Sequence, residues 1–251
     1  MHGSPWHLYD RLIARARSRE PLRRVLLGLS WSVAQVRSWG LCFSPSDPPR
    51  TLTFPGTLAG RRAAELVAWS RSFDPCEAVV GCAVINAVIN DDANPCLERS
   101  EPLAGTAPPH LRVFAHFRDQ VRDATVVVVG RYPGLEEIWS GQKYLCLERR
   151  SLPGALPDTA AEYVLPGADW VFLTASAIAN KTLPRLLELS RRATVVLMGP
   201  SLPWIEEWSD YGVQYLAGVA VREPELLWEV SAEGGGTRIF EDAIEYRLLR
   251  L

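Results

Sequence analysis

The feature that most constrains the fold is a regular alternation of apolar runs and helical segments in the second half of the chain. The runs are ATVVVVG, YLCLE, WVFLTAS, TVVLMG and VQYLAGVAV, and the helical segments between and after them cover residues 135–140, 158–165, 182–190, 204–211 and 224–232. The first run is continuously β-branched, which is typical of a strand buried on both faces. This alternation predicts a Rossmann-like α/β domain, in which helices cover both faces of a mainly parallel sheet.

The first half of the chain has a different pattern. Apolar residues at helical spacing predict an amphipathic helix over 6–16, and β-rich runs predict a small antiparallel meander over 25–31, 33–43 and 51–54. Two helices are expected next, over 58–70 and 75–90, with Asp74 as the cap of the second. The second helix, PCEAVVGCAVINAVIN, is apolar on nearly every side, so we expect it to be buried.

Between these patterns, residues 93–109 are rich in Asp, Asn, Pro, Gly and Ser. Such a composition buries little apolar area and indicates a linker without structure of its own. We therefore divide the chain into a small α+β subdomain at 1–92, a linker at 93–109 and the Rossmann-like domain at 110–251, which begins with a helix over 110–122.

Charge and composition exclude several classes of protein. The 251 residues carry 27 basic and 29 acidic side chains, so no net field attracts nucleic acid. No apolar run approaches the roughly 18 residues that cross a bilayer, and the N-terminal residues do not form a secretion signal, so we expect a cytoplasmic protein without a membrane partner. The five cysteines share no C-x-x-C spacing, which argues against a disulfide framework or a zinc knuckle and favours reduced core thiols.

Candidate binding residues follow the predicted parallel strands, because ligands bind at the carboxyl ends of such strands. Small, hydroxyl-bearing or polar residues stand there: Gly130, Arg131 and Tyr132; Glu148; Thr174 and Ser176; and Gly199, Pro200 and Ser201. They let a ligand approach backbone N–H groups. Tight turns use the same residue types, so a purely structural role stays open for each.

Glu148 lies close to the offset at which a Rossmann acid binds a ribose hydroxyl. The first turn, GRYPG, lacks the G-x-G-x-x-G pattern that a pyrophosphate needs, which disfavours a dinucleotide. A nucleoside ligand such as S-adenosylmethionine stays open. So does the alternative that Glu148, next to Arg149 and Arg150, is only a solvated charge.

Two further sets of polar residues are candidate binding sites. Asp158 and Glu162 are one helical turn apart, so they could bind a cation or transfer protons together, although capping a helix would also explain Asp158. Asn180, Lys181 and Thr182 begin a predicted helix, where N–H groups and an ammonium could hold an anion.

Other catalytic patterns are missing from the sequence. The four histidines show no zinc spacing, and no G-x-S-x-G elbow, Walker loop or H-E-x-x-H occurs. Serine hydrolase, P-loop and zinc-protease activities therefore find no support.

The order of motifs resembles a known family. The segments WHLYDRLIARA, LAGRRAAEL, GCAVINAVIN, VVVVGRYPG and VVLMGPSLP, and above all residues 156–191, LPDTAAEYVLPGADWVFLTASAIANKTLPRLLELSR, are similar to the putative heavy-metal chelation family. That family joins an enolase N-terminal-like subdomain to a Rossmann-like domain. The resemblance implies a site at the junction of the two, with Trp31, Asn86 and Asn90 on one side and the strand ends on the other.

Together these observations favour a protein that binds or processes a small metal-linked molecule, such as a chelator or metallophore precursor, between the two domains. The alternative is an enzyme that uses S-adenosylmethionine or a related nucleoside at the strand ends. The cofactor thus stays open between a divalent metal and S-adenosylmethionine. Nine tryptophans keep a homo-oligomer open as a third possibility.

Overall fold

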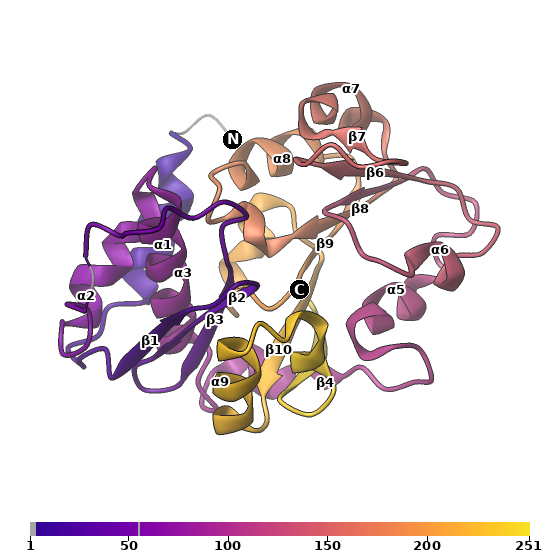
Figure 1. Cartoon of the computed structure of the whole chain (residues 1–251). Helices are drawn as coiled ribbons and strands as arrows, with labels where there is room; N and C mark the ends of the chain where they lie inside the picture. Colours follow the sequence, from indigo (N-terminus) through magenta and orange to yellow (C-terminus); the bar gives the residue numbers. More distant parts are fainter. Residues whose placement is uncertain (1–3, 55) are drawn as a thin grey trace.

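Two sheets organise the chain, and the computed structural model describes them through residues 4–54 and 56–251. Residues up to 92 are here called the first half, residues 93–109 the connection and residues 110–251 the second half. Figure 1 shows the first half, in indigo and purple, beside the large sheet of the second half. The mixed α/β class expected from the sequence is confirmed, while the exact domain boundaries stay a prediction.

The first half packs helices on a small antiparallel sheet of order β1-β2-β3. Its elements are α1 (Trp6–Arg15), β1 (Arg24–Leu27), β2 (Trp31–Gln35), β3 (Trp39–Phe43), α2 (Ala63–Leu66) and α3 (Pro75–Ile89). Helix α3 is buried on nearly all sides, as its composition predicts. Asp74 caps it, because one carboxylate oxygen accepts from the backbone N–H groups of Cys76 and Glu77, both at 2.9 Å.

Three expectations for the first half need correction. The run over 33–43 contains two strand segments joined by a turn at 36–38, because Val36 N–H donates to the carbonyl of Ser38 within that turn. Residues 51–54 form no strand; the ring of Phe54 packs instead against Trp69, with 4.9 Å between the ring centres. The helix expected over 58–70 begins only at Ala63, after Gly60 adopts φ +86°, and becomes a 3₁₀ helix at Val67–Arg71.

The large sheet has the order β4-β11-β10-β9-β8-β5-β6-β7. The strands from β5 to β10 run parallel to one another, as the sequence pattern predicts. They are β5 (Val126–Val129), β6 (Tyr144–Glu148), β7 (Leu156–Pro157), β8 (Trp170–Thr174), β9 (Thr194–Met198) and β10 (Tyr215–Val221), and the helices between and after them are α6 (Leu135–Ile138), α7 (Ala161–Val164), α8 (Leu183–Leu189) and α9 (Pro224–Ala232). The expected helix over 110–122 is confined to α5 (Arg112–Phe117) and a preceding 3₁₀ turn, and the segment 204–211 forms a 3₁₀ helix at Glu206–Tyr211.

The sequence pattern missed the antiparallel edge of this sheet. Strand β11 (Ile244–Arg250) pairs antiparallel with β10, and its other side pairs with β4 (Glu101–Pro102). The connection is therefore not featureless: it contains α4 (Pro95–Arg99), whose Cys96 and Leu97 are buried, as well as β4. Asn94 orders this segment, since its side chain donates to the carbonyls of Ile89 and Trp204, both at 2.8 Å.

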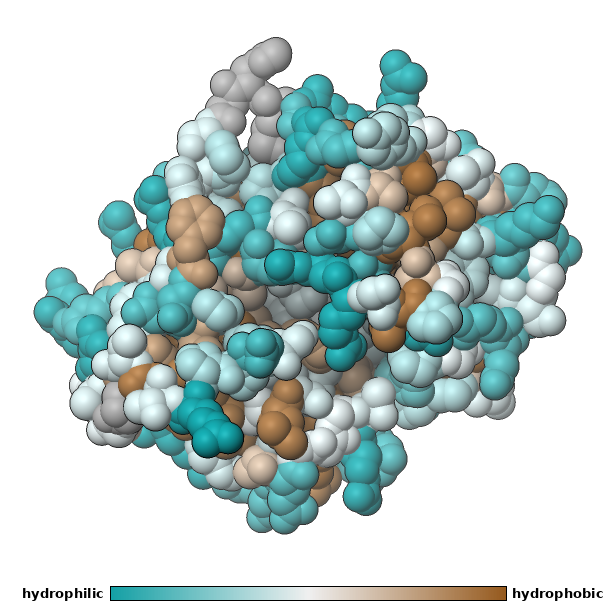
Figure 2. Space-filling view, turned by 45° about the horizontal axis from the view of Figure 1, so that its top comes forward, coloured by the Kyte–Doolittle hydropathy of each residue, from teal (hydrophilic) through white to brown (hydrophobic). Residues whose placement is uncertain are grey.

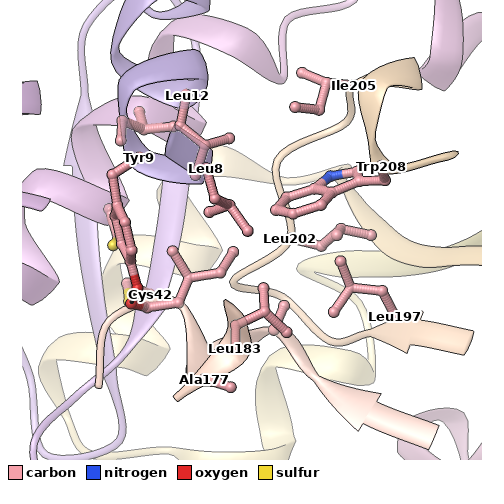
Figure 3. Packing of buried hydrophobic residues seen from close by; sticks show 14 of the residues in the cluster. Leu8, Tyr9, Leu12, Cys42, Ala177, Leu183, Leu197, Leu202, Ile205 and Trp208 are labelled. Atoms are coloured by element: carbon pink, nitrogen blue, oxygen red, sulfur yellow. Dashed lines mark hydrogen bonds between the residues drawn. The ribbon is translucent and has the colours of Figure 1, made fainter. Parts of the chain in front are cut away.

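A continuous apolar core joins the two halves. Leu8 and Leu12 of α1 belong to the same buried cluster as Leu183, Leu202 and Trp208 of the second half (Figure 3). The face in Figure 2 is mainly hydrophilic, with separate small hydrophobic areas, and it is hollowed near its centre. No helix within residues 4–54 and 56–251 is long and apolar enough to span a membrane.

Candidate functional site

The strand order reverses between β5 and β8, and this reversal creates a polar switch point. β6 follows β5 on one side, whereas β8 pairs with β5 on the other. The two carboxyl ends bring Gly130 beside Thr174: a Cβ on Gly130 would lie 3.3 Å from the Thr174 methyl group. Gly130 also has φ +101°, a conformation that favours glycine.

Three hydroxyl groups line this switch point. Thr174 Oγ1 and Ser176 Oγ lie 2.9 Å apart, and the ring of Tyr132 borders the same point, 3.6 Å from where a Cβ on Gly130 would lie. Burial raises the pKa of Tyr132 to about 12, so its phenol stays protonated at neutral pH. The structure thus brings together four of the residues that the sequence singled out, Gly130, Tyr132, Thr174 and Ser176, around a point where a ligand can meet both donors and acceptors.

Next to this group, Arg131 and Tyr132 line a small cavity of about 20 Å³ between β5, β6 and α6, enough for one water molecule. Glu148 stands at its edge and holds two loops. Its carboxylate accepts from the backbone N–H groups of Arg131, at 3.2 Å, and Arg150, at 3.1 Å. Both oxygens are therefore engaged with the backbone, which makes a ribose-binding role for Glu148 less favourable than the sequence offset suggests.

The expected carboxylate pair of Asp158 and Glu162 does not form. Asp158 pairs with Arg149 at 3.5 Å and makes no capping hydrogen bond, whereas both oxygens of Glu162 accept from Arg185, at 2.8 and 2.6 Å. The helix between them is only α7 with a 3₁₀ turn before it, so the two side chains meet different arginines. Within the described residues, no cluster of three or more His, Cys, Asp or Glu side chains could hold a metal ion.

The segment from Asn180 to Thr182 lies at the junction with the first half. Asn180 Oδ1 accepts from both the backbone N–H and the hydroxyl of Thr182, at 3.1 and 2.6 Å, so this group stabilises a turn. Lys181 has φ +68°, and its ammonium donates to the carbonyl of Ala179 at 2.7 Å and lies 5.7 Å from the ring centre of Tyr9. Burial lowers the pKa of Lys181.

The C-terminal end of α3 contacts the second half through Asn90, which lies one turn after Asn86. Asn90 donates to the carbonyl of Leu202 and accepts from the N–H of Trp204, both at 2.9 Å. Asn86 is fully buried and donates to the carbonyl of Leu41 at 2.8 Å, but its Oδ1 has no hydrogen-bond partner among the described residues. Trp31 does not share this wall, because its indole N–H donates to Gly236 at 2.8 Å and its ring packs against Phe240.

The turn after β9 closes the junction from the other side. Gly199 has φ +111°, and Pro200 and Ser201 behind it are buried. Ser201 Oγ accepts from the N–H of Phe43, at the end of β3, at 2.9 Å. These three residues therefore follow β9, and Ser201 contacts the first half through Phe43.

Three neighbours of this contact were not singled out from the sequence. Cys42 on β3 and Cys82 on α3 are buried in the same core cluster. Tyr9 of α1 donates to the carbonyl of Ile178 at 2.8 Å. The spacing of Cys82, Asn86 and Asn90 at every fourth position of α3 is the signal that could have revealed this polar face.

The fold and the switch point define a Rossmann-like α/β protein with a small helical and antiparallel first half. The chain belongs to the family described as putative heavy-metal chelation, since a model of that description matches residues 112–250. A second model with the same description matches residues 9–89.

Two solved structures of unknown function from this family, called DUF364, are similar to the chain over its whole length. The one from Desulfitobacterium hafniense is 27% identical, with a TM-score of 0.83 and 98% of each chain covered. The one from Pyrococcus horikoshii is 18% identical, with a TM-score of 0.79 and with 98% of this chain and 99% of that chain covered. No curated protein matches the sequence.

Proposed function

We propose that the protein binds or processes a small metal-linked molecule, such as a metal chelate or a chelator precursor, at the switch point between β5 and β8. The observation that carries this proposal is the group of three hydroxyl-bearing side chains, Tyr132, Thr174 and Ser176, beside Gly130, which has no side chain of its own. Such a group offers several donors and acceptors to the polar part of a chelator. Family membership supports a link with metals.

The position of these hydroxyls favours a ligand that binds between the halves. From Thr174 the chain runs through Ser176 to Ile178 and Lys181, which contact Tyr9 of the first half. A molecule bound at the hydroxyls would therefore lie near a segment that reaches the junction. The alternative of an S-adenosylmethionine enzyme is less favoured, because both oxygens of Glu148 hold backbone N–H groups.

A thermal-shift screen tests the proposal. The probes are nickel(II) and iron(III), each free and as complexes with citrate and with catechol, and S-adenosylmethionine is included for the alternative. We expect at least one complex to raise the melting temperature, since a ligand that binds only the folded state stabilises it. Elemental analysis of protein purified without added metal gives a second readout.

Matched variants locate the binding. Thr174→Val and Ser176→Ala should remove the response, whereas Thr194→Val, at the opposite end of the same sheet, should keep it. No shift with any probe, together with metal-free protein, would refute the proposal. If the response persists in both switch-point variants, the ligand binds elsewhere in the protein.

A further inference from the structure

One lysine at the junction of the halves lies on strained backbone. Lys181 has φ +68°, in the left-handed region, and it is the one residue other than glycine with a positive φ among residues 4–54 and 56–251. A glycine would adopt this conformation without strain, because it has no Cβ. The backbone therefore favours glycine at this position, and a lysine in its place points to a role for the side chain.

The ammonium of Lys181 has few partners. Within the described residues it donates to the carbonyl of Ala179 at 2.7 Å and lies 5.7 Å from the ring centre of Tyr9, and neither group carries a charge. An ammonium has three N–H donors, and the carbonyl accepts from one of them. The side chain is only partly exposed, and burial lowers its pKa. A partly buried cation without an ionised partner is costly, so an anion beside it would stabilise it.

Lys181 belongs to the same segment as the hydroxyls of the switch point. The carbonyl of Ser176 accepts from the N–H of Ala179 at 3.1 Å. The carbonyl of Ile178 then accepts from the N–H of Lys181 at 3.2 Å. These consecutive turns keep the chain compact between Ser176 and Lys181, so a small molecule at the hydroxyls lies close to the lysine.

The exposed side of this segment is polar and carries one charge. Residues 174, 176 and 179–182 are partly exposed, whereas the apolar residues between them are buried. We call these six residues the polar strip, and Lys181 is its only ionisable side chain. The neighbouring contact between the halves, residues 199–204, is also uncharged. A ligand on the polar strip therefore meets neutral hydroxyls and a single positive charge.

We propose that the ammonium of Lys181 binds a carboxylate of the ligand that the switch-point hydroxyls hold. The inference rests on the proposed function for the position of the ligand, and it adds the chemical class, a carboxylic acid in its anionic form. One ammonium balances one carboxylate, whereas a phosphate monoester carries about two negative charges at neutral pH. The single charge of the polar strip therefore favours a carboxylate over a phosphate.

The first test uses the full chain without metal and two probes that differ in charge. Salicylate carries a hydroxyl and a carboxylate, and salicylamide has a neutral amide in place of the carboxylate. With lysine labelled at the side-chain nitrogen, salicylate should shift the NMR signal of Lys181 and leave that of Lys143, the other lysine of the chain, nearly unmoved. Salicylamide should shift neither signal, and inorganic phosphate should bind more weakly than salicylate. No shift of Lys181 with salicylate, or equal shifts of both lysines, would overturn the inference.

Lysine variants separate ligand binding from a structural role. Lys181→Gly removes both the backbone strain and the partly buried charge, so this variant should melt at least as high as the natural chain. Its affinity for salicylate should nevertheless fall about tenfold, because a hydrogen bond to a charged group is lost. Lys181→Arg should keep part of the affinity, and Lys143→Met should change neither property. If Lys181→Gly binds salicylate as tightly as the natural chain, or melts several degrees below it, the lysine has a structural role and the inference is wrong.

The carboxylate site and the proposed function can fail separately. If salicylate binds at Lys181 but no metal complex raises the melting temperature, the link with metals is wrong and the carboxylate site stands. If the response to a metal complex is lost in Thr174→Val but unchanged in Lys181→Gly, the proposed function stands and the carboxylate site is wrong.

Discussion

The hydroxyl of Tyr9 donates a hydrogen bond of 2.8 Å to the backbone carbonyl of Ile178. This bond joins α1 to the segment after β8, and both partners are buried. Burial raises the pKa of Tyr9, so its phenol remains a donor at neutral pH. The contact between the halves is therefore fixed by a specific polar bond within an apolar core.

Tyr9→Phe should lower the free energy of unfolding by about 1–3 kcal/mol, because the Ile178 carbonyl is then left buried without its donor. Urea denaturation followed by tryptophan fluorescence measures the change. Tyr163→Phe is the control, since Tyr163 is 86% exposed. Equal stability of the natural chain and Tyr9→Phe would show that the bond contributes nothing.

Asp74→Ala should destabilise the protein by about 1 kcal/mol, because α3 loses the cap of two N–H groups. Asp74→Asn should recover most of this loss, since an amide oxygen can accept the same bonds. Thermal unfolding of both variants, with exposed Asp47→Ala as control, checks the prediction. If the asparagine variant is no better than alanine, the cap is not the cause.

Gly130→Ala should cost about 1–2 kcal/mol, because φ +101° strains any residue with a Cβ. The added methyl group also meets Thr174, so the variant should weaken any ligand response at the switch point. Gly167→Ala is the control, because a Cβ there meets nothing within 4 Å. Unchanged stability would mean that the turn relaxes freely.

The pair of Glu162 and Arg185 predicts a pH effect. Hydrogen bonds from Arg185 hold the pKa of the Glu162 carboxyl below its ordinary value. The stability that this lowered pKa contributes is present above the unfolded-state pKa and is lost as pH falls through the folded-state value. Arg185→Gln should raise the pKa of Glu162 in a carboxyl NMR titration, whereas Arg192→Gln should not; an unmoved value would contradict the pairing.

Lys181 offers a spectroscopic check of its burial. Lysine labelled at the side-chain nitrogen gives two signals in this chain, and Lys143→Arg assigns them. Burial lowers the pKa of Lys181, so its signal should titrate below the ordinary range for lysine. A value in the ordinary range would place its ammonium in solvent.

The sequence was sufficient for the parallel strands, because continuous apolar runs such as Val126–Val129 have no stable place except a doubly covered sheet. It failed for β11, although Ile244 and Tyr246 alternate with Glu245 and Arg247, since an antiparallel edge breaks the expected strand-helix order. It also failed for the connection, where a five-residue helix and a short strand are ordered by contacts with distant segments and not by local composition.

The same difference between local and distant contacts applies to the residues of the site. Residues at strand ends were correctly brought together, because the sheet itself fixes Gly130 next to Thr174. The sequence alone did not reveal which side chains pair between separate elements. Glu162 pairs with Arg185 and Asp158 with Arg149, because these contacts depend on how separate elements pack.

Strand β4 has a consequence for the order of assembly. It belongs to the connection, yet its sole neighbour in the sheet is β11, which the ribosome makes long after it. Glu101 and Pro102 are therefore synthesised before their partner strand, and the parallel strands are made in the interval. The antiparallel edge of the large sheet is therefore completed last, after the parallel strands and the residues that join the two halves have been made.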